Sequence, residues 1–420
     1  MIGFFPCFLS VGETLPVVKI AKSYMKKGGK AIFFSHGGVH ERLAREIGCE
    51  VIKLQKLTWK KARENIEWGT LAFEERIFKA YTKETIDSFV KEEIEAFKKA
   101  GIKLLVSSFN ITGSISARVL NIPLIVLASG TSIPPFYKSG SVTFPENYEN
   151  NFTKILPSFL KNQIARYVFL NIKLLVKEFN EVGKKYNIRP FRTLNDIITG
   201  DHTFVCDDIN FLGIQPTKDY PRENFVGPIL GDIFEKKQGK VDDDIKKHLE
   251  RPGKSILFMM GTTRDSRMFL KILDKLNQTD YNIIVVYTTI PEERLPKTND
   301  NILLKKFIKN PILVNKMVDL AVIHGGRGTV YTTAYSGKPA IGIPYYSEHQ
   351  YNIDNIVRNG AGLRISMKFF KTEDLLNAIN TIFSEYDSYL KNAQNLAARL
   401  TTVPGHEKAA QRLIEISEKI

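Results

Sequence analysis

Short apolar runs alternate with longer helical patterns along the amino-terminal part of the chain. Runs of strand length occupy residues 2–9, 31–35, 50–54, 103–107 and 124–127. Between them, apolar residues recur at helical spacing over residues 15–27, 40–47 and 114–120. Apolar strands that alternate with helices are typical of a parallel sheet whose two faces are both covered.

The same alternation begins again after residues 210–240, which are rich in proline, glycine and charge and which we interpret as a connection. Strand-length runs follow at residues 255–260, 282–287, 302–304, 320–323 and 340–343. We therefore expect two similar α/β halves with a cleft between them. Ligands of open α/β sheets bind at the carboxyl ends of the strands, so we expect the chemistry in the loops there.

Length and cysteine content narrow the class of protein. A chain of 420 residues is too long for one ordinary core, which also favours two domains. The three cysteines, Cys7, Cys49 and Cys206, are scattered and form no metal-binding motif, so the sequence supports neither a disulfide framework nor a zinc site. We expect a cytoplasmic protein, soluble or at the inner face of the membrane, because no apolar run approaches the roughly 20 residues of a membrane span.

The formal net charge of +15 is compatible with nucleic acid, anionic lipid or an anionic small substrate, and also with a plain lysine-rich surface. Nucleic acid has the least support, because no helix-turn-helix, zinc finger or RNA-binding aromatic motif is present. Residues 159–179 mix apolar and basic residues at a spacing that predicts one amphipathic helix. This helix either faces an acceptor or a membrane, or packs on its own domain, and the second is the commoner case.

The strongest chemical signal is a glycine-rich turn between a buried strand and a helix. The strand at residues 319–323 leads into His324, Gly325, Gly326, Arg327, Gly328 and Thr329, and a helix over residues 329–336 follows. Glycines allow a sharp turn with exposed backbone N–H groups, and the amino end of a helix adds partial positive charge. His324 and Arg327 add side-chain donors, and Thr329 is a candidate N-cap. The turn therefore predicts a phosphate site, although a tight turn without ligand has the same glycine spacing.

A longer stretch, residues 324–365, resembles the donor-binding signature of GT-B glycosyltransferases of the family that includes UDP-glycosyltransferases and macrolide glycosyltransferases. The matching positions are His324, Gly326, Gly328, Thr329, Gly337, Pro339, Pro344, Glu348 and Asn352. Residues 12–16 and the glycine turn at 28–29 are similar to the family's amino-terminal pattern. Residues 225–228, Phe-Val-Gly-Pro, are similar to the segment that opens its carboxyl-terminal domain.

This resemblance implies a GT-B fold, in which two Rossmann-like parallel-sheet domains face each other across a cleft. The expected domains are an acceptor-binding domain, residues 1–222, and a donor-binding domain, residues 223–404. A helix at about residues 405–420 is expected to pack back on the first domain.

The resemblance also implies inverting transfer of a sugar from a nucleoside-diphosphate donor, a UDP-sugar in the first instance, to a hydroxyl of a small molecule or lipid. Neither a metal nor a cofactor is expected, since the nucleotide sugar is itself a substrate. The donor diphosphate would lie between the 324–329 loop and Gly261-Thr262, the nucleobase against Phe307 and Ile308, and the sugar against Glu348 and His349. The sequence does not identify the acceptor, the sugar or the oligomeric state. A lipid-linked acceptor, with peripheral association of the protein with the membrane, is one alternative.

Three positions depart from the family pattern. Glu13 stands where the family has its catalytic histidine, and a carboxylate can serve as the general base, although Glu13 also suits an ordinary helix start. Ser108 stands near the position of the acid that supports this histidine, so a His–Asp relay is absent, and a carboxylate base would not need it. Thr332 replaces the ribose-binding glutamate, which leaves the nucleoside open.

Further residues have two interpretations each. His36 either faces the cleft or makes a local hydrogen bond, and the second is commoner. Trp59 and Trp68 would line an acceptor pocket or pack in the core, and Arg264 and Arg267 would assist the diphosphate or lie on the surface.

Two alternatives to a transferase remain at this level. The departures favour a catalytically silent GT-B protein that binds nucleotide or activates a partner, and a sugar-nucleotide epimerase has less support.

Overall fold

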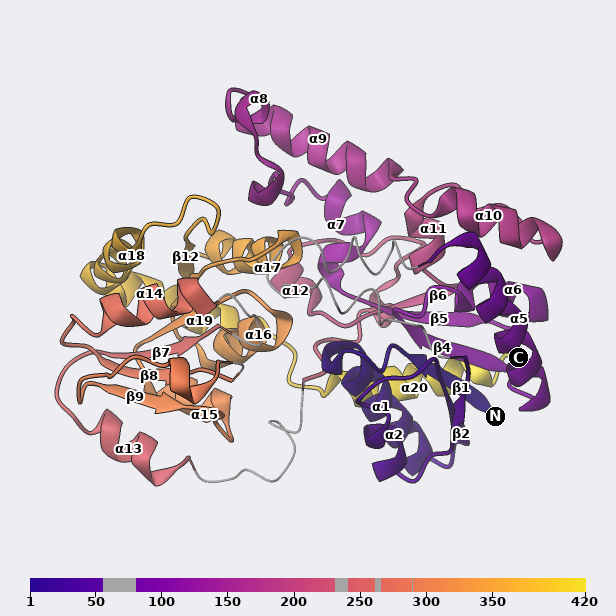
Figure 1. The fold of residues 1–420 in the computed structure, drawn as a ribbon, viewed down its shortest axis with the longest axis horizontal. Helices are drawn as coiled ribbons and strands as arrows, with labels where there is room; N and C mark the ends of the chain where they lie inside the picture. Colours follow the sequence, from indigo (N-terminus) through magenta and orange to yellow (C-terminus); the bar gives the residue numbers. More distant parts are fainter. Residues whose placement is uncertain (56–80, 231–240, 261–265, 289) are drawn as a thin grey trace.

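The computed structural model describes residues 1–55, 81–230, 241–260, 266–288 and 290–420. They contain two parallel sheets of six strands each, one in each half of the molecule (Figure 1). We call the half built on the first sheet the N lobe and the half built on the second sheet the C lobe. The predicted α/β fold with two Rossmann-like halves is confirmed.

The first sheet has the strand order β3-β2-β1-β4-β5-β6. Its strands are β1 (Ile2–Pro6), β2 (Ala31–Ser35), β3 (Val51–Lys53), β4 (Leu104–Ser108), β5 (Leu124–Ala128) and β6 (His202–Val205). The central strands are apolar on both faces because helices cover both sides, and all five residues of β1 are buried. The helices of the N lobe before residue 230 are α1 (Val11–Lys26), α2 (Arg42–Glu46), α5 (Lys83–Lys99), α6 (Gly113–Leu120), α7 (Pro134–Lys138), α8 (Asn151–Lys154), α9 (Ser158–Asn171), α10 (Val176–Lys185), α11 (Leu194–Ile198) and α12 (Ile209–Leu212).

The second sheet repeats this arrangement with the order β12-β11-β10-β7-β8-β9. Its strands are β7 (Ser255–Met259), β8 (Asn282–Val286), β9 (Ile302–Lys305), β10 (Leu320–Ile323), β11 (Ala340–Gly342) and β12 (Gly362–Arg364). Its helices are α13 (Asp243–Leu249), α14 (Ser266–Leu276), α15 (Pro311–Met317), α16 (Arg327–Ser336), α17 (Ser347–Arg358), α18 (Thr372–Ser384) and α19 (Tyr386–Arg399). Short 3-10 turns are η1 (Gly130–Ser132), η2 (Glu146–Tyr148), η3 (Arg222–Asn224) and η5 (Glu292–Arg294).

The last helix, α20 (Gly405–Ser417), returns to the N lobe and packs along α1. Its buried residues Ala409, Leu413 and Ile416 belong to the same apolar cluster as Val17 and Ile20 of α1. The core of the N lobe is therefore completed by the end of the chain, as Figure 1 shows.

Two strands were not predicted from the sequence, and two helices begin at other residues than predicted. β6 (His-Thr-Phe-Val) and β12 (Gly-Leu-Arg) contain polar residues or glycine, so no continuous apolar run marks them. The first helix begins at Val11 and not at residue 15, which puts Glu13 in its first turn. The helix after the glycine-rich turn begins at Arg327 with Gly326 as N-cap, so Thr329 is not the cap and instead donates to the Gly326 carbonyl at 2.9 Å.

The single helix predicted over residues 159–179 is wrong. α9 ends at Asn171, Leu175 has a left-handed backbone with φ of +64°, and α10 then starts. The break lets Leu175 and Phe179 enter the N-lobe core. Of the apolar residues of α9, Ala165, Phe169 and Leu170 pack against a core cluster, and the others are exposed.

The two lobes are joined by a set of polar contacts beside α17. Arg364 pairs with Glu146 of the N lobe, and its Nε lies 2.8 Å from Asp354. Gln350 Nε2 donates to Thr143 Oγ1 at 2.8 Å, and its Oε1 accepts from the Glu146 amide at 2.9 Å. These contacts are mostly shielded from solvent and fix the N-lobe segment before α8 against the C lobe.

Among the helices of the described residues, none is both long and apolar enough to cross a bilayer.

Replacing Leu413 with alanine should lower the free energy of unfolding by about 2–5 kcal/mol, because the side chain is fully buried between α20 and α1. Chemical denaturation followed by circular dichroism measures this loss. Gln411→Ala, at an exposed position of the same helix, is the matched control and should change stability little. Equal effects of the two substitutions would show that α20 does not complete the core.

Candidate active site

Both sheets have a topological switch point, where ligands of doubly wound folds bind. In the N lobe it lies between β1 and β4, whose last paired residues are Pro6 and Ser108. In the C lobe it lies between β7 and β10, where Ile323 pairs with Met259. The residues just beyond these two strand ends are therefore the first candidates for a site.

Glu13 lies at the N-lobe switch point. It is half-buried in the first turn of α1, and the hydroxyl of Ser108, the last residue of β4, donates a hydrogen bond to its Oε2. Two of the three positions at which the sequence departs from the family pattern, Glu13 and Ser108, are thus in direct contact. A hydroxyl that donates to the carboxylate fixes its orientation without adding a charge.

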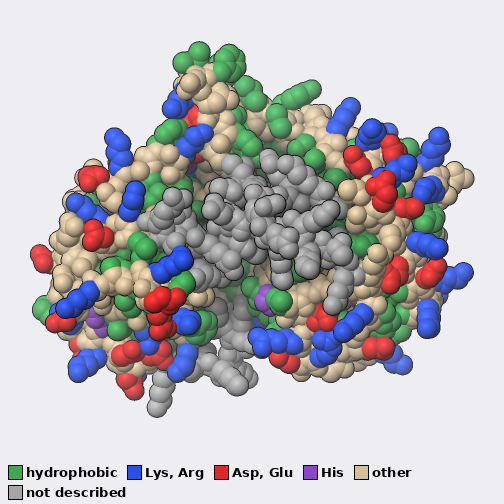
Figure 2. Space-filling model, in the orientation of Figure 1, with side chains coloured by type: hydrophobic (Ala, Val, Ile, Leu, Met, Phe, Trp, Pro, Cys, Tyr) green, Lys and Arg blue, Asp and Glu red, His purple; other side chains and the backbone are tan. Residues whose placement is uncertain are grey.

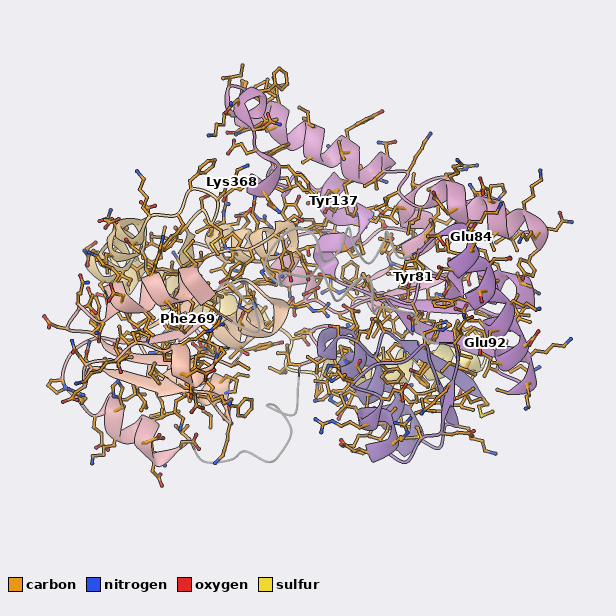
Figure 3. The ribbon with its side chains drawn as sticks, viewed as in Figure 1. Tyr81, Glu84, Glu92, Tyr137, Phe269 and Lys368 are labelled. Atoms are coloured by element: carbon orange, nitrogen blue, oxygen red, sulfur yellow. The ribbon has the colours of Figure 1, made fainter. Side chains whose placement is uncertain are left out.

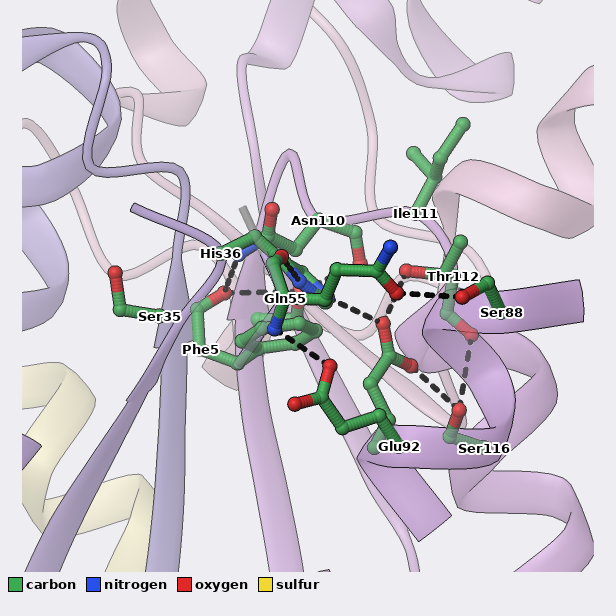
Figure 4. Close-up of polar contacts among 12 residues, drawn as sticks. Phe5, Ser35, His36, Gln55, Ser88, Glu92, Asn110, Ile111, Thr112 and Ser116 are labelled. Carbon is green, nitrogen blue, oxygen red and sulfur yellow. Dashed lines mark hydrogen bonds and ion pairs between the residues drawn. The ribbon is translucent and has the colours of Figure 1, made fainter. Parts of the chain in front are cut away.

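His36 and Glu93 form a second polar cluster behind the same strand ends (Figure 4). His36 Nε2 lies 2.9 Å from Glu93 Oε1, and His36 Nδ1 lies 2.7 Å from the Gln55 carbonyl. The hydroxyls of Thr112 and Ser116 also donate to the Glu93 carboxylate, each at 2.5 Å. Both ring nitrogens lie within hydrogen-bond distance of oxygen atoms, one of the Gln55 carbonyl and one of the Glu93 carboxylate. His36 therefore makes local hydrogen bonds and has no free nitrogen for proton transfer.

The glycine-rich turn lies at the C-lobe switch point and is shaped by α17. Gly325 has φ of +94°, and a side chain there would come within 2.6 Å of the His349 carbonyl. Asn352 Nδ2 donates to the Gly325 carbonyl at 3.0 Å. Gly328, in the first turn of α16, faces open space. The first amides of a helix have no intrahelical acceptor, so this end of α16 offers N–H groups to an anion.

Two buried histidines support the turn from behind. The rings of His324 and His349 lie 4.8 Å apart edge to face, and the ring of His349 lies 3.7 Å from that of Tyr346. Burial lowers the pKa of His324 to about 4, and hydrogen bonding to the backbone at Met259 offsets only part of this effect. Burial and the neighbouring His324 lower the pKa of His349 as well. Both rings are therefore neutral at pH 7, and the formal charge of the turn comes from Arg327.

Arg327 connects the turn to the N lobe. Its Nη1 lies 3.9 Å from Oδ2 of Asp207, a fully buried residue that follows β6. Burial raises the pKa of Asp207, while Arg327 and the Gly130 amide, which donates at 2.6 Å, oppose that rise. Asp207, Glu348 and Glu13 all act to raise the pKa of Arg327. Carboxylates from both lobes thus lie within electrostatic reach of one guanidinium.

The structure places the remaining predicted site residues as follows. Phe307 has an exposed ring after β9, whereas Ile308 is packed in the C-lobe core. Thr332 is buried, and its hydroxyl donates to the Gly328 carbonyl at 2.7 Å. Glu348 lies in the first turn of α17 and Arg267 in α14. Gly261, Thr262, Arg264, Trp59 and Trp68 lie outside the described residues.

Asp207 is the main site residue that sequence reasoning missed. The signal for it was small: a short apolar run, Thr-Phe-Val-Cys, followed by two aspartates. Once β6 is recognised as a strand, both aspartates stand at its carboxyl end and become candidates.

Comparison with known proteins identifies the glycosyltransferase family that the sequence resembles. The sequence model of the family "UDP-glucoronosyl and UDP-glucosyl transferase" matches residues 17–402. The chain is 23% identical to rabbit (Oryctolagus cuniculus) UDP-glucuronosyltransferase 2B14 over 381 residues, covering 81% of this chain and 66% of the relative. It is 22% identical to human 2-hydroxyacylsphingosine 1-beta-galactosyltransferase, covering 72% of this chain and 56% of the relative. The chain thus spans between about half and two thirds of the length of these relatives.

Among solved structures, the calicheamicin glycosyltransferase CalG4 is similar with a TM-score of 0.72 at 14% identity, covering 100% of this chain and 98% of that one. This likeness shows the fold, which is the GT-B arrangement expected from the sequence.

Stability should fall as the pH is lowered from about 6.5 towards 4. The unfolded chain has histidines with a pKa near 6.5, so in this interval it binds protons that buried His324 does not, and protonation favours unfolding. The contribution of His324 is present above this interval and amounts to ~3 kcal/mol. Thermal unfolding between pH 4 and 7.5 should therefore show a smaller pH dependence for His324→Gln than for the unaltered chain.

At the upper end of this range His324 is neutral in both states, so the difference between the two proteins there reports only the packing cost of the substitution. Parallel stability curves over the whole range would contradict the assignment of a buried neutral His324.

Replacing Glu93 with glutamine should cost about 1–3 kcal/mol of stability, because an amide NH2 would replace one of the buried oxygens that accept from the Thr112 and Ser116 hydroxyls. Denaturant unfolding measures the cost. Glu95→Gln, at an exposed position on the same helix, is the matched control. A cost no larger than that of the control would show that this hydrogen-bond network contributes little to stability.

Proposed function

The chain belongs to the UDP-glucoronosyl and UDP-glucosyl transferase family, and on this premise we propose that it transfers a sugar from a nucleoside-diphosphate donor to an acceptor hydroxyl. A UDP-sugar is the proposed donor, and a small molecule or lipid is the proposed acceptor. The observation that carries the proposal is geometric: Glu13 lies at the switch point of the N-lobe sheet, and Arg327 lies at that of the C-lobe sheet and reaches Asp207 of the N lobe. A base and an anion site on opposite lobes are what such a transfer needs.

The proposed leaving-group site is the amino end of α16. Its exposed amides and the Arg327 guanidinium would stabilise the negative charge that develops on the diphosphate. His324 is buried and neutral, so its proposed role is to shape the turn and not to supply charge. The donor side would then be served by Arg327 and backbone dipoles, without a metal or a further cofactor.

The proposed base is Glu13. In the reaction the acceptor oxygen would form a bond to the anomeric carbon, its proton would pass to the Glu13 carboxylate, and the carbon–oxygen bond to the diphosphate would break with its electrons. Attack from the N-lobe side on a donor held by the C lobe gives inversion at that carbon. Ser108 would act as a positioning residue, because its hydroxyl holds the carboxylate of Glu13.

A lipid acceptor is one candidate within this proposal. The human relative is named for galactosyl transfer to 2-hydroxyacylsphingosine, and this chain carries a basic net charge of +15. We propose the cytoplasm, including the inner face of the membrane, as its location, in keeping with three free cysteines.

A catalytically silent nucleotide-binding or partner-activating protein is the second candidate. It is favoured by Glu13 in place of the family's histidine and by Thr332, whose hydroxyl is engaged by Gly328 within α16.

Glu13→Gln should lower turnover about 100-fold or more while nucleotide binding persists, since it removes the base and leaves the C lobe intact. The measurements are release of UDP from UDP-glucose or UDP-glucuronic acid with a panel of hydroxyl acceptors, and the thermal shift that UDP produces. Glu46→Gln, at an exposed site of the same lobe, should leave both readouts unchanged.

The results separate the candidates. Unaltered turnover in Glu13→Gln would overturn the base assignment. A thermal shift with UDP but no UDP release from the unaltered protein with any acceptor would favour the silent candidate. No thermal shift with any nucleoside diphosphate would overturn the donor site.

A further inference from the structure

The α8–α9 surface of the N lobe exposes an unusual number of large apolar side chains. Phe152, Ile155, Phe159 and Tyr167 are each at least 66% exposed, and Leu160, Ile164 and Val168 are also exposed. None of the 14 residues of α9 is buried. Single exposed apolar residues are ordinary, but a contiguous group marks a surface that contacts something else.

The apolar residues lie on the outer side of α9, away from the lobe. The inner side is defined by its contacts: the ring of Phe169 stacks on Tyr137 of α7 at 3.4 Å, and Asn162 Oδ1 accepts from the Phe144 amide at 2.8 Å. Tyr137 is labelled below α9 in Figure 3. Helical spacing places Leu160, Ile164 and Tyr167 on the opposite side from these two residues. The exposed apolar side of α9 is therefore not the side that attaches α9 to the N lobe.

The charge of the segment is entirely basic. Between Glu149 and Glu178 the sequence contains no acidic residue, and it contains Lys154, Lys161, Arg166, Lys173 and Lys177. Of these, Lys161 is paired with Glu149 at 2.5 Å. Basic residues close to a membrane surface are attracted to anionic lipids.

The position of the segment leaves this surface accessible. α8 and α9 project from the body of the molecule along its upper edge in Figure 1, and apolar side chains gather along the same edge in Figure 2. The backbone break before α10 separates α9 from the packed core behind it. A helix with an apolar outer side, basic flanks and too little length to span a bilayer fits the plane of a membrane interface.

We infer that the α8–α9 surface docks this protein on an anionic lipid bilayer, with Phe159, Ile164 and Tyr167 entering the headgroup region. Apolar burial and attraction to anionic lipids act together, so both are required for stable docking. This inference goes beyond the proposed transfer reaction and does not depend on it.

The test is co-sedimentation of the full chain with phosphatidylcholine vesicles that do or do not contain phosphatidylglycerol, at low and high salt. Binding should require phosphatidylglycerol and weaken as salt is raised, because salt screens exposed charges. A variant that combines Phe159→Ser, Ile164→Ser and Tyr167→Ser should bind at least about 10-fold more weakly, a loss of ~1.4 kcal/mol. Its circular dichroism melt should match that of the unaltered chain, since these side chains are exposed.

The matched control combines Val39→Ser and Met317→Ser, which remove exposed apolar side chains elsewhere, and it should bind vesicles normally. A second variant, with Lys154→Gln, Arg166→Gln and Lys173→Gln, should lose the preference for phosphatidylglycerol. Absence of sedimentation at low salt, or equal binding by the serine variant, would overturn the inference. So would dimerisation in solution that the serine variant abolishes, because the surface would then bind a second copy of the chain.

Failure here is distinguishable from failure of the proposed function. Donor binding is measured by the thermal shift with UDP in the absence of lipid, and it involves none of the substituted residues.

Discussion

The arrangement of the molecule depends on a charge pair buried where the two lobes meet. Asp207 follows the N-lobe strand β6, and Arg327 begins the C-lobe helix α16. A buried carboxylate is costly unless it is paired and hydrogen-bonded, and Asp207 also accepts from the Gly130 amide. The adjacent Asp208 accepts from the Thr401 amide at 2.8 Å, and its own amide donates to Tyr331 of α16 at 2.8 Å. Two consecutive residues therefore hold the amino end of α16 at a fixed position relative to the N-lobe sheet.

With the lobes held in this way, the C lobe supplies the positive charge of the site and the N lobe supplies a carboxylate. The buried histidines behind the glycine-rich turn are neutral, so Arg327 and the helix end carry the positive character of the C-lobe side. On the N-lobe side, the carboxylate of Glu13 is held by Ser108 at the end of β4. A shift between the lobes would change the distance between these groups without altering either of them.

The sequence predicted most of the fold, because long apolar runs mark buried parallel strands. Those runs identified ten of the twelve strands, and the exceptions, β6 and β12, contain polar residues or glycine that interrupt an apolar run. The glycine-rich turn could be predicted because strand, turn and helix are contiguous. The Ser108–Glu13 contact and the Asp207–Arg327 pair could not, since each joins residues far apart in sequence. For residues 159–179 the sequence left open whether the helix faces outward or packs on its own domain, because spacing alone does not say which side of a helix the protein covers.

The return of the chain to the N lobe has a consequence for how such proteins can be recombined. α20 packs on α1, so the C lobe is an insertion between two segments that build one N-lobe core. A chimaera that exchanges the C lobe must therefore be spliced at two junctions, one before α13 and one between α19 and α20. A single crossover would combine α1 of one parent with α20 of another and would force two unrelated helix surfaces to share a core.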